Sequence, residues 1–337
     1  MVKTYFWFVA VVLSSLTACI SGAETDSSSL PSSSGKYGEV LVVIDTAFEN
    51  GPVGEKIREI FQAELSGTPQ AEPLFRMSTV DPDYFKSILK RSRNLFKLSI
   101  KKKNQNKVSV DRNVWAKDQL LINVYADSPK AALRILEKNT TGIRDYFNEE
   151  EIMRLQKQFD KQLQEDLMSD LEQKLGVELK IPPAFVKMGT DSNVAWLKKE
   201  KSIGQHTIIQ GLVVYTQDYT SKEVFSDSMM IASRDQVTRT LIEGFRDNSF
   251  MKIYDELPLF TEEINLGGYY SKEYRGLWHM ENDFMGGPFL HYTLVDEENQ
   301  KVIHLDGFVY APKFNKREYL RELEAIIKGM KLSVSSK

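Results

Sequence analysis

The chain has 337 residues, with 44 basic and 47 acidic side chains and a formal net charge of −3 at pH 7. This near balance lacks the basic excess of a nucleic-acid-binding protein, so we expect no nucleic-acid partner. Cys19 is the only cysteine, so we expect no intramolecular disulfide, and a chain of this length can build a sufficient hydrophobic core instead.

Residues 1–18 have the features of a lipoprotein signal peptide. Lys3 gives the start a positive charge, and the largely apolar stretch YFWFVAVVLSSL follows it. This stretch is long enough for a signal peptide but shorter than the roughly 20 residues of a transmembrane helix. The letters LTAC then give a leucine, two small residues and Cys19, the pattern at which lipoprotein signal peptidase cleaves after lipid attachment. The alternative is an ordinary secretory signal with an incidental cysteine.

Lipidation at Cys19 would anchor the mature protein to a membrane, because two acyl chains are enough for stable attachment. Ile20 occupies the position where aspartate marks retention in the inner membrane, so we expect the outer membrane. Some bacteria export lipoproteins to the cell surface when an acidic cluster follows the cysteine. Here only two separated acids, Glu24 and Asp26, are present, so we expect the periplasmic face, with the cell surface as the alternative. A lipidated thiol also excludes a cysteine nucleophile or metal ligand.

The segment after the cysteine is rich in serine and poor in large apolar residues. It reads ISGAETDSSSLPSSSGKYG over residues 20–38. Such a composition cannot bury enough surface to order itself. We therefore expect residues 19–38 to be a lipidated cysteine followed by a flexible tether.

Residues 39–148 predict a first α+β subdomain. The β-branched run EVLVVID (39–45) predicts a strand, and an amphipathic helix follows it up to Gly67. Ser128 and Pro129 then fit the N-cap and first position of another helix. Further strands are expected at 72–80, 94–100, 106–110 and 118–126.

Residues 149–331 predict a second subdomain that opens with a long helix at about 149–175. Large apolar residues recur in it at four-residue intervals: Phe159, Leu163, Leu167, Leu171 and Leu175. Because this spacing drifts around a helix, it favours packing on a sheet over the alternative, a coiled-coil-like dimer seam.

The second half repeats the element order of the first. VELKIPPAFV (177–186) is similar in pattern to LFRMSTVDPDYF (74–85), and IIQGLVVYTQ (208–217) to KDQLLINVYA (117–126). We therefore expect an α+β fold of two similar subdomains with mostly antiparallel sheets. An internal duplication and a long connecting helix would account for this pattern.

The C-terminal part predicts a strand, a glycine loop, a hairpin turning at DEENQ and a closing amphipathic helix. Asn315, with Glu318 three residues later, is the expected cap of that helix. Five blocks of the chain resemble a family of uncharacterised lipoproteins of Bacteroidetes-type bacteria, domain of unknown function 4837. They are TPQAEPLF (68–75), NVWAKDQ (113–119), RGLW (275–278), FMGGPF (284–289) and GFVYAP (307–312). The resemblance covers nearly the whole mature chain after the tether. It implies an envelope lipoprotein and brings no activity, cofactor or catalytic residue.

The hairpin supplies weak candidates for catalysis. Its most amphipathic register places His291 opposite Asp306 on the solvent side, together with His304. A carboxylate beside an imidazole orients and activates it, as a general base requires. Polar side chains in solvent are the more common interpretation. No zinc-ligand motif is present, and we expect no metal and no cofactor.

The glycine loops supply candidates for ligand binding. Trp278 and Phe284 flank Gly286 and Gly287, where glycine permits close backbone approach. Arg275 is suited to an anionic ligand. A tight turn with aromatic residues in the core is the alternative interpretation.

The sequence therefore favours a lipid-anchored, non-enzymatic protein of the cell envelope that binds a ligand or an envelope protein partner. The alternative is a periplasmic hydrolase acting on peptide or glycan. It would use His291, His304 and Asp306, or the carboxylates of Glu281 and Asp283.

Overall fold

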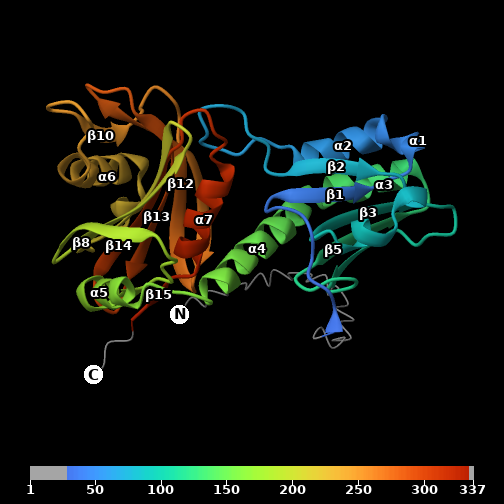
Figure 1. The fold of residues 1–337 in the computed structure, drawn as a ribbon, viewed down its shortest axis with the longest axis horizontal. Helices are drawn as coiled ribbons and strands as arrows, with labels where there is room; N and C mark the ends of the chain where they lie inside the picture. The colour runs from blue at the N-terminus through green and yellow to red at the C-terminus, as the bar shows by residue number, and fades with distance from the viewer. Residues whose placement is uncertain (1–28, 334–337) are drawn as a thin grey trace, which may run out of the picture.

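The computed structural model describes residues 29–333, which form two domains joined by a helix (Figure 1). The expected signal peptide, Cys19 and the first part of the expected tether lie outside these residues. The α+β class and the division into two domains are confirmed. Within residues 29–333, every helix is too short or too polar to cross a membrane.

The first domain is a five-stranded sheet in the order β2-β1-β3-β5-β4. Its strands are β1 (Glu39–Val43), β2 (Arg76–Val80), β3 (Asn94–Ile100), β4 (Lys107–Arg112) and β5 (Leu120–Ala126). All neighbours are parallel except β4 and β5. The run LLINVYA of β5 is almost wholly buried, as expected for a strand covered on both faces.

Helices cover one face of this sheet, and short 3₁₀ segments cover the other. The helices are α1 (Thr46–Glu49), α2 (Pro52–Phe61) and α3 (Pro129–Lys138), and the 3₁₀ segments are η2 (Pro82–Tyr84) and η3 (Ser87–Arg91). Ser128 caps α3 as expected, because its Oγ accepts the Ala131 N–H at 3.3 Å. On the helical side, Phe61 packs edge-on against Phe75, Phe96 and Phe147.

The long helix is broken where the sequence predicted it to be continuous. It divides into α4 (Thr140–Phe159) and α5 (Glu165–Leu175), so the expected bounds of 149–175 are wrong at the start and at the break. A tight turn after Phe159 redirects the chain, and Gln164 N then donates to the carbonyl of Ile181. The two helices run in different directions, yet Phe159 of α4 and Leu171 of α5 are buried in the same core. This agrees with the expectation that the apolar residues of this region pack on a sheet.

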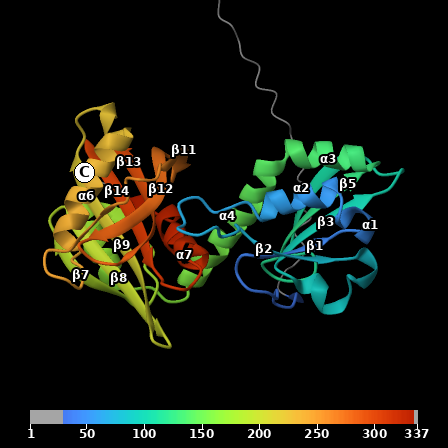
Figure 2. The same cartoon turned by 90° about the horizontal axis from the view of Figure 1, so that it is seen from above.

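The helix α4 connects the two lobes, as Figures 1 and 2 show. The domain division expected after residue 148 falls inside this helix. Its first half packs on the first domain through Ile143 and Phe147, and its second half joins the core of the second domain through Ile152 and Leu155.

The second domain is an antiparallel eight-stranded sheet in the order β10-β12-β13-β14-β9-β8-β7, with β11 also paired to β12. Its strands are β7 (Phe185–Asp191), β8 (Val194–Ile203), β9 (His206–Asp218), β10 (Phe250–Ile253), β11 (Phe260–Leu266), β12 (Tyr269–Glu281), β13 (Gly286–Asp296) and β14 (Lys301–Tyr310). A separate pair is formed by β6 (Val177–Glu178) and β15 (Lys331–Leu332). The remaining helical segments are η4 (Lys222–Phe225), α6 (Asp227–Leu241) and α7 (Arg317–Lys328).

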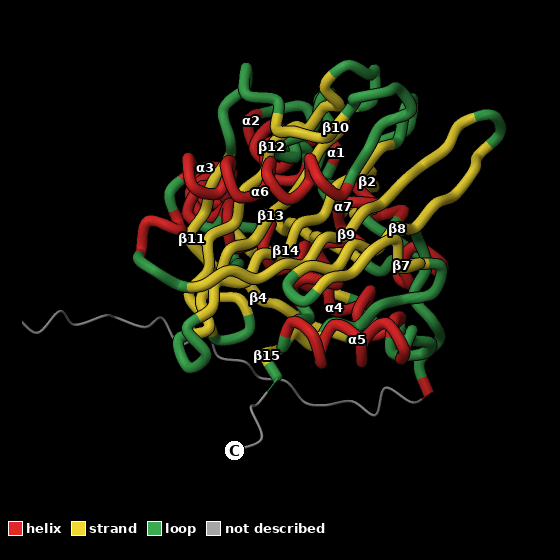
Figure 3. Tube along the Cα trace, turned by 90° about the vertical axis from the view of Figure 1, so that its left-hand side faces the viewer, coloured by secondary structure: helices red, strands yellow, loops and turns green. Residues whose placement is uncertain are grey.

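Helices cover both faces of this second sheet. Leu323 and Ile327 of α7 pack with Leu290 and Leu305 on one face. Met230 of α6 packs with Tyr215, Trp278 and Phe308 on the other face, and Figure 3 shows α6 lying across the strands. Side chains on both faces of β13 and β14 are therefore buried.

The two sheets do not support the expected internal duplication. The first sheet is mainly parallel and the second is antiparallel. The segment 177–186, compared with 74–85, contains parts of two different strands, β6 and β7. Apolar periodicity indicates that a strand is buried, but it does not indicate which neighbour the strand pairs with. A similar order of elements in the two halves therefore did not imply similar sheets.

The end of the expected tether is ordered against the first domain. Ser34 N donates to the carbonyl of Arg91 at 2.8 Å, and Arg93 N donates back to the carbonyl of Ser34 at 2.9 Å. The guanidinium of Arg93 lies 4.3 Å from the ring centre of Tyr37, and Tyr37 Oη donates to Gln158 of α4 at 2.7 Å. The tether prediction is therefore wrong for residues 32–38, because backbone pairing and one tyrosine hold a segment that is otherwise polar.

A carboxylate of the first domain caps a helix of the second. Both oxygens of buried Glu72 accept the Lys316 N–H, at 2.8 and 2.9 Å, and Oε2 also accepts the Arg317 N–H at 3.0 Å. These N–H groups open α7, so a negative charge lies at the positive end of the helix dipole. The cap expected from Asn315 is replaced by this one. Arg317 and Arg321 also donate to the carbonyls of Pro73 and Leu74.

We predict that Glu72→Gln lowers the free energy of unfolding by about 1–2 kcal/mol, because a buried charge at a helix N-terminus is lost. Urea unfolding of the full chain measures this loss. Glu55→Gln is the matched control, since Glu55 lies exposed in the first turn of α2 and should change stability by about 0.5 kcal/mol or less. Equal effects of the two variants would contradict an interdomain cap.

Candidate functional site

The hairpin of β13 and β14 brings the weak catalytic candidates together in the expected register. His291 lies opposite Asp306, and Thr293 lies opposite His304. His291 Nδ1 is 3.0 Å from Asp306 Oδ2, and His291 Nε2 is 3.1 Å from His304 Nδ1. Three side chains therefore form a continuous hydrogen-bonded row across the two strands.

Arg234 of α6 completes this row from above the sheet. Its Nε donates to Asp306 Oδ2 at 2.6 Å, and its Nη2 donates to Oδ1 at 3.2 Å. Such a two-point contact is the strongest geometry for an arginine and a carboxylate. The sequence analysis missed Arg234, although it stands between Met230 and Thr238 on a buried stripe of α6 at four-residue spacing.

The expectation that this face is solvated is wrong. The side chains of Arg234, His291 and Asp306 are all 0% exposed. Tyr215 stacks on His304 with ring centres 4.4 Å apart, and Arg234 lies 4.2 Å from the ring centre of Phe289. The helix α6 covers the polar face, so no member of the row meets solvent.

Burial sets the protonation states in the row. It lowers the pKa of His291 and holds the pKa of His304 well below its usual value. Burial alone would raise the pKa of Asp306, but the charge of Arg234 and the hydrogen bond from His291 lower it. At neutral pH the row is thus an arginine–aspartate ion pair with two neutral imidazoles.

The hydrogen bonds imply one arrangement of protons. His291 Nδ1–H donates to the carboxylate of Asp306, so His291 Nε2 accepts the Nδ1–H of His304. His304 Nε2 is then an acceptor, and it is buried without a partner among residues 29–333. An Asp–His pair of this kind orients a base, but here the second nitrogen of His291 is bonded to His304, and the row ends in the protein interior.

The other candidate acids lie apart from this row. Glu281 is at the far end of β12, where it pairs with Lys252 at 3.0 Å. It lies seven positions beyond Tyr274, the residue opposite His291, which corresponds to roughly 20 Å along a strand. Asp283 instead accepts the backbone N–H groups of Phe245 and Phe284, both at 2.7 Å.

Two of the ligand-binding candidates, Trp278 and Gly287, are packed in the core, whereas Gly286 is exposed at the start of β13. Trp278 is 1% exposed, and a Cβ added at Gly287 would lie 2.0 Å from the carbonyl oxygen of Val309. A Cβ at Gly286 would lie 3.0 Å from the carbonyl oxygen of Trp278. These glycines permit close strand packing, as the alternative interpretation expected. Phe284 is 85% exposed in the preceding turn, where Arg246 lies 4.2 Å from its ring centre.

Arg275 lines a cavity of about 380 Å³ between the two domains. Its Nη2 lies 3.1 Å from Glu324 Oε2, and its Nε also pairs with Glu273. Burial would raise the pKa of Glu324, but Arg275 and Lys328 lower it to about 2. On this wall, the buried charges of Arg275, Glu273 and Glu324 therefore compensate one another through ion pairs.

Comparison with protein-family models divides the chain at the end of α4. Residues 164–329 match the model of DUF4837, a domain of unknown function, and residues 33–160 match that of DUF8532, also a domain of unknown function. The second domain contains the DUF4837 match, and the first domain contains the DUF8532 match. The blocks at 68–75 and 113–119 fall within the DUF8532 match, so the expectation that one family covers nearly the whole mature chain is corrected.

Comparison with curated proteins finds no match. Among solved structures, the chain is similar to a point mutant of protein Mog1, with a TM-score of 0.30, and to the Saccharomyces cerevisiae Ran-binding protein Mog1p, with a TM-score of 0.32. Both are 8% identical, and both matches cover 48% of this chain and 93% or 92% of the other. Likenesses this weak carry no argument about fold or function.

The interdomain cavity combines groups from the DUF8532 and DUF4837 domains. Arg144 of α4 lines it and donates to the carbonyls of Ile60 and Glu59, at 2.9 and 2.8 Å. Among the described residues, no carboxylate forms an ion pair with Arg144. Glu64 of the first domain and Glu262 of the DUF4837 domain are exposed on the same wall. Groups of both signs thus face one space.

We predict that the protein loses stability as the pH falls from 7.5 to 5. Because His291 and His304 have lowered pKa values in the fold, the unfolded chain binds their protons first, below about pH 6.5. Each histidine then costs up to about 1.4 kcal/mol per pH unit, until the pH reaches its folded pKa. Urea midpoints across this range measure the slope.

His304→Gln should lower stability at pH 7.5 and make the pH slope shallower, because one buried titrating group is removed. His206→Gln, in the hairpin between β8 and β9, is the control and should keep the slope of the unmodified chain. If His304→Gln leaves the slope unchanged, the pH dependence of stability does not come from the buried histidines.

Proposed function

We propose that the protein is a lipid-anchored, non-enzymatic protein of the cell envelope that binds a small zwitterionic solute between its two domains. The observation that carries the proposal is the interdomain cavity of about 380 Å³, whose wall holds arginine and glutamate side chains from both domains. Cavities of about 300–1,000 Å³ at domain interfaces are the usual place for small ligands.

The charges of the wall favour a ligand that carries both signs. Four arginines and four glutamates line the cavity: Arg144, Arg275, Arg317, Arg321, Glu64, Glu262, Glu273 and Glu324. A balanced wall gives no net attraction for a simple anion or cation. A carboxylate beside Arg144 and an ammonium beside Glu64 or Glu262 would satisfy the groups that have no ion-pair partner among the described residues. An amino acid or a short peptide has this chemistry.

The burial of His291, His304 and Asp306 weighs against the hydrolase alternative. A general base must reach the proton it abstracts, and these side chains lie beneath α6, outside the interdomain cavity. Glu281 and Asp283 lie elsewhere and make their own ion pair and backbone hydrogen bonds. No observation on the described residues favours peptide or glycan hydrolysis.

The lipid anchor rests on the sequence LTAC that ends at Cys19. We place the protein at the outer membrane because Ile20 follows the cysteine, and on its periplasmic face because Glu24 and Asp26 are separated and form no acidic cluster. Since residues 32–38 are bound to the first domain, only the residues before them separate the domain from the anchor. The first domain would therefore lie close to the membrane surface.

We predict that the protein takes up radiolabelled palmitate in growing bacteria and that Cys19→Ser abolishes this labelling. Lipid attachment at the cysteine precedes cleavage of the signal peptide, so the variant should also keep its leader. Ser14→Ala in the apolar stretch is the control and should be labelled normally. Unlabelled protein, or cleavage at another bond, would refute the anchor without touching the binding proposal.

We predict that the full chain binds glycylglycine in isothermal titration calorimetry and binds N-acetylglycylglycine at least tenfold more weakly. The acetyl group removes the ammonium that Glu64 or Glu262 would accept. Arg144→Gln should weaken glycylglycine binding at least tenfold, whereas Arg134→Gln, on the exposed side of α3, should not change it. The cavity assignment fails if neither peptide binds, or if Arg144→Gln binds as well as the unmodified chain.

A further inference from the structure

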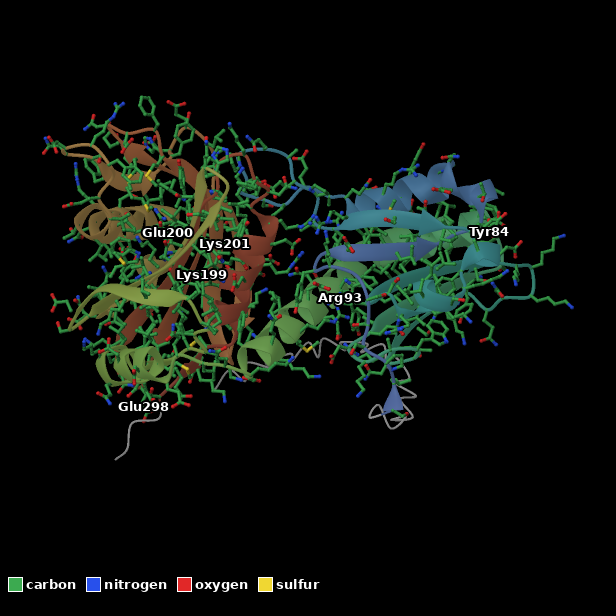
Figure 4. All side chains as sticks on the ribbon, viewed as in Figure 1. Tyr84, Arg93, Lys199, Glu200, Lys201 and Glu298 are labelled. Carbon is green, nitrogen blue, oxygen red and sulfur yellow. The ribbon has the colours of Figure 1, made fainter. Side chains whose placement is uncertain are left out.

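A second cavity lies at the opposite end of the DUF4837 domain. It measures about 700 Å³ and lies between the hairpin of β11 and β12, the turn between β13 and β14, and the segment after β9. Glu298 lines it, and Figure 4 shows this residue at the lower end of the second lobe, away from the first domain. The cavity is therefore separate from the interdomain cavity.

Aromatic side chains form much of its wall. Tyr219, Phe225, Tyr269 and Tyr270 all line it. Phe225 and Tyr270 meet edge to face, with ring centres 5.0 Å apart. Tyr270 is nevertheless 52% exposed, so a large ring surface remains open. The tight turn at Gly267 and Gly268, both with positive φ, places Tyr269 and Tyr270 at the start of β12.

The charged groups of this wall are mainly acidic. Asp296, Glu297 and Glu298 come from the turn between β13 and β14, and Lys222 is the single basic residue of the lining. Asp296 fixes the turn, because it accepts the backbone N–H of Asn299 at 3.1 Å and its side-chain amide at 2.7 Å. Nearby lysines are paired elsewhere, Lys272 with Asp227 and Lys301 with Asp218. The described charged groups of this wall are therefore mainly negative.

A polar atom on the wall has no partner within the described part of the chain. Ser333 lines the cavity, and its hydroxyl is buried and makes no hydrogen bond with residues 29–333. Burial of an unpaired hydroxyl is costly, which favours a ligand with a hydrogen-bonding group.

We propose that this cavity binds a compact organic cation, an alkylammonium that also carries a hydroxyl group. Aromatic faces attract a cation through the negative charge of their π surface, and the effect grows when water is displaced. The carboxylates of the turn add attraction for a positive charge and repel anions. This site goes beyond the proposed binding between the domains and does not depend on it.

The test compares choline with 3,3-dimethyl-1-butanol, which has the same shape and hydroxyl group but no charge. We expect the full chain in detergent to bind choline at least tenfold more tightly than this neutral compound in isothermal titration calorimetry. Tyr270→Leu should weaken choline binding at least fivefold, because it keeps an apolar side chain and removes the π surface. Tyr84→Leu is the control, since Tyr84 is 75% exposed in the first domain.

Glu297→Gln should weaken choline binding more at low than at high salt concentration, because salt screens the attraction that the carboxylate provides. Glu200→Gln on β8 should leave choline binding unchanged at every salt concentration. Equal binding of the two compounds would overturn the proposal, because the cavity would then be only apolar. Binding of methyl glucoside without binding of choline would also overturn it. Arg144→Gln should bind choline normally, so failure at the interdomain cavity and failure here are distinguishable.

Discussion

The ion pair between Arg234 and Asp306 is the interaction on which the DUF4837 domain depends. It ties α6 to the centre of the sheet, where both partners are fully buried. Removing one partner of such a pair typically costs about 3–5 kcal/mol, because the other charge is left uncompensated. By closing one face of the sheet while α7 closes the other, it also buries the only Asp–His pair of the hairpin. The two cavities described above therefore lie at the edges of the domain.

Those edges differ in chemistry because different elements form them. Near the first domain, the carboxylate of Glu72 holds α7 in place, and the arginines of α7 donate to backbone carbonyls of the same loop. The contacts between α7 and residues 72–74 thus fix the position of the two domains on either side of the interdomain cavity. At the far end, turns together with the ends of β12, β13 and β15 enclose the second cavity, and their tyrosines and carboxylates give it an aromatic, mainly acidic wall.

Local patterns predicted the elements well where the signal is local. The run NLFKLSI matches β3, Ser128 caps α3, and the hairpin register places His291 opposite Asp306. Prediction failed where a distant segment decides the outcome. The break after Phe159, the cap from Glu72 and the cover over His304 all come from residues far away in the chain, and no short-range periodicity reports them.

By itself, the sequence determined the α+β class, the order of strands and helices, and the pairing within the hairpin, because propensity, turn residues and alternation act between near neighbours. It also supplied the lipid-attachment pattern at Cys19, which needs no fold to be read. Only the tertiary structure decided that the two sheets differ in strand direction, that the histidine face is dry and that Arg275 lines a cavity. Those outcomes depend on which surfaces meet, and burial and charge pairing across such contacts are properties of the whole chain.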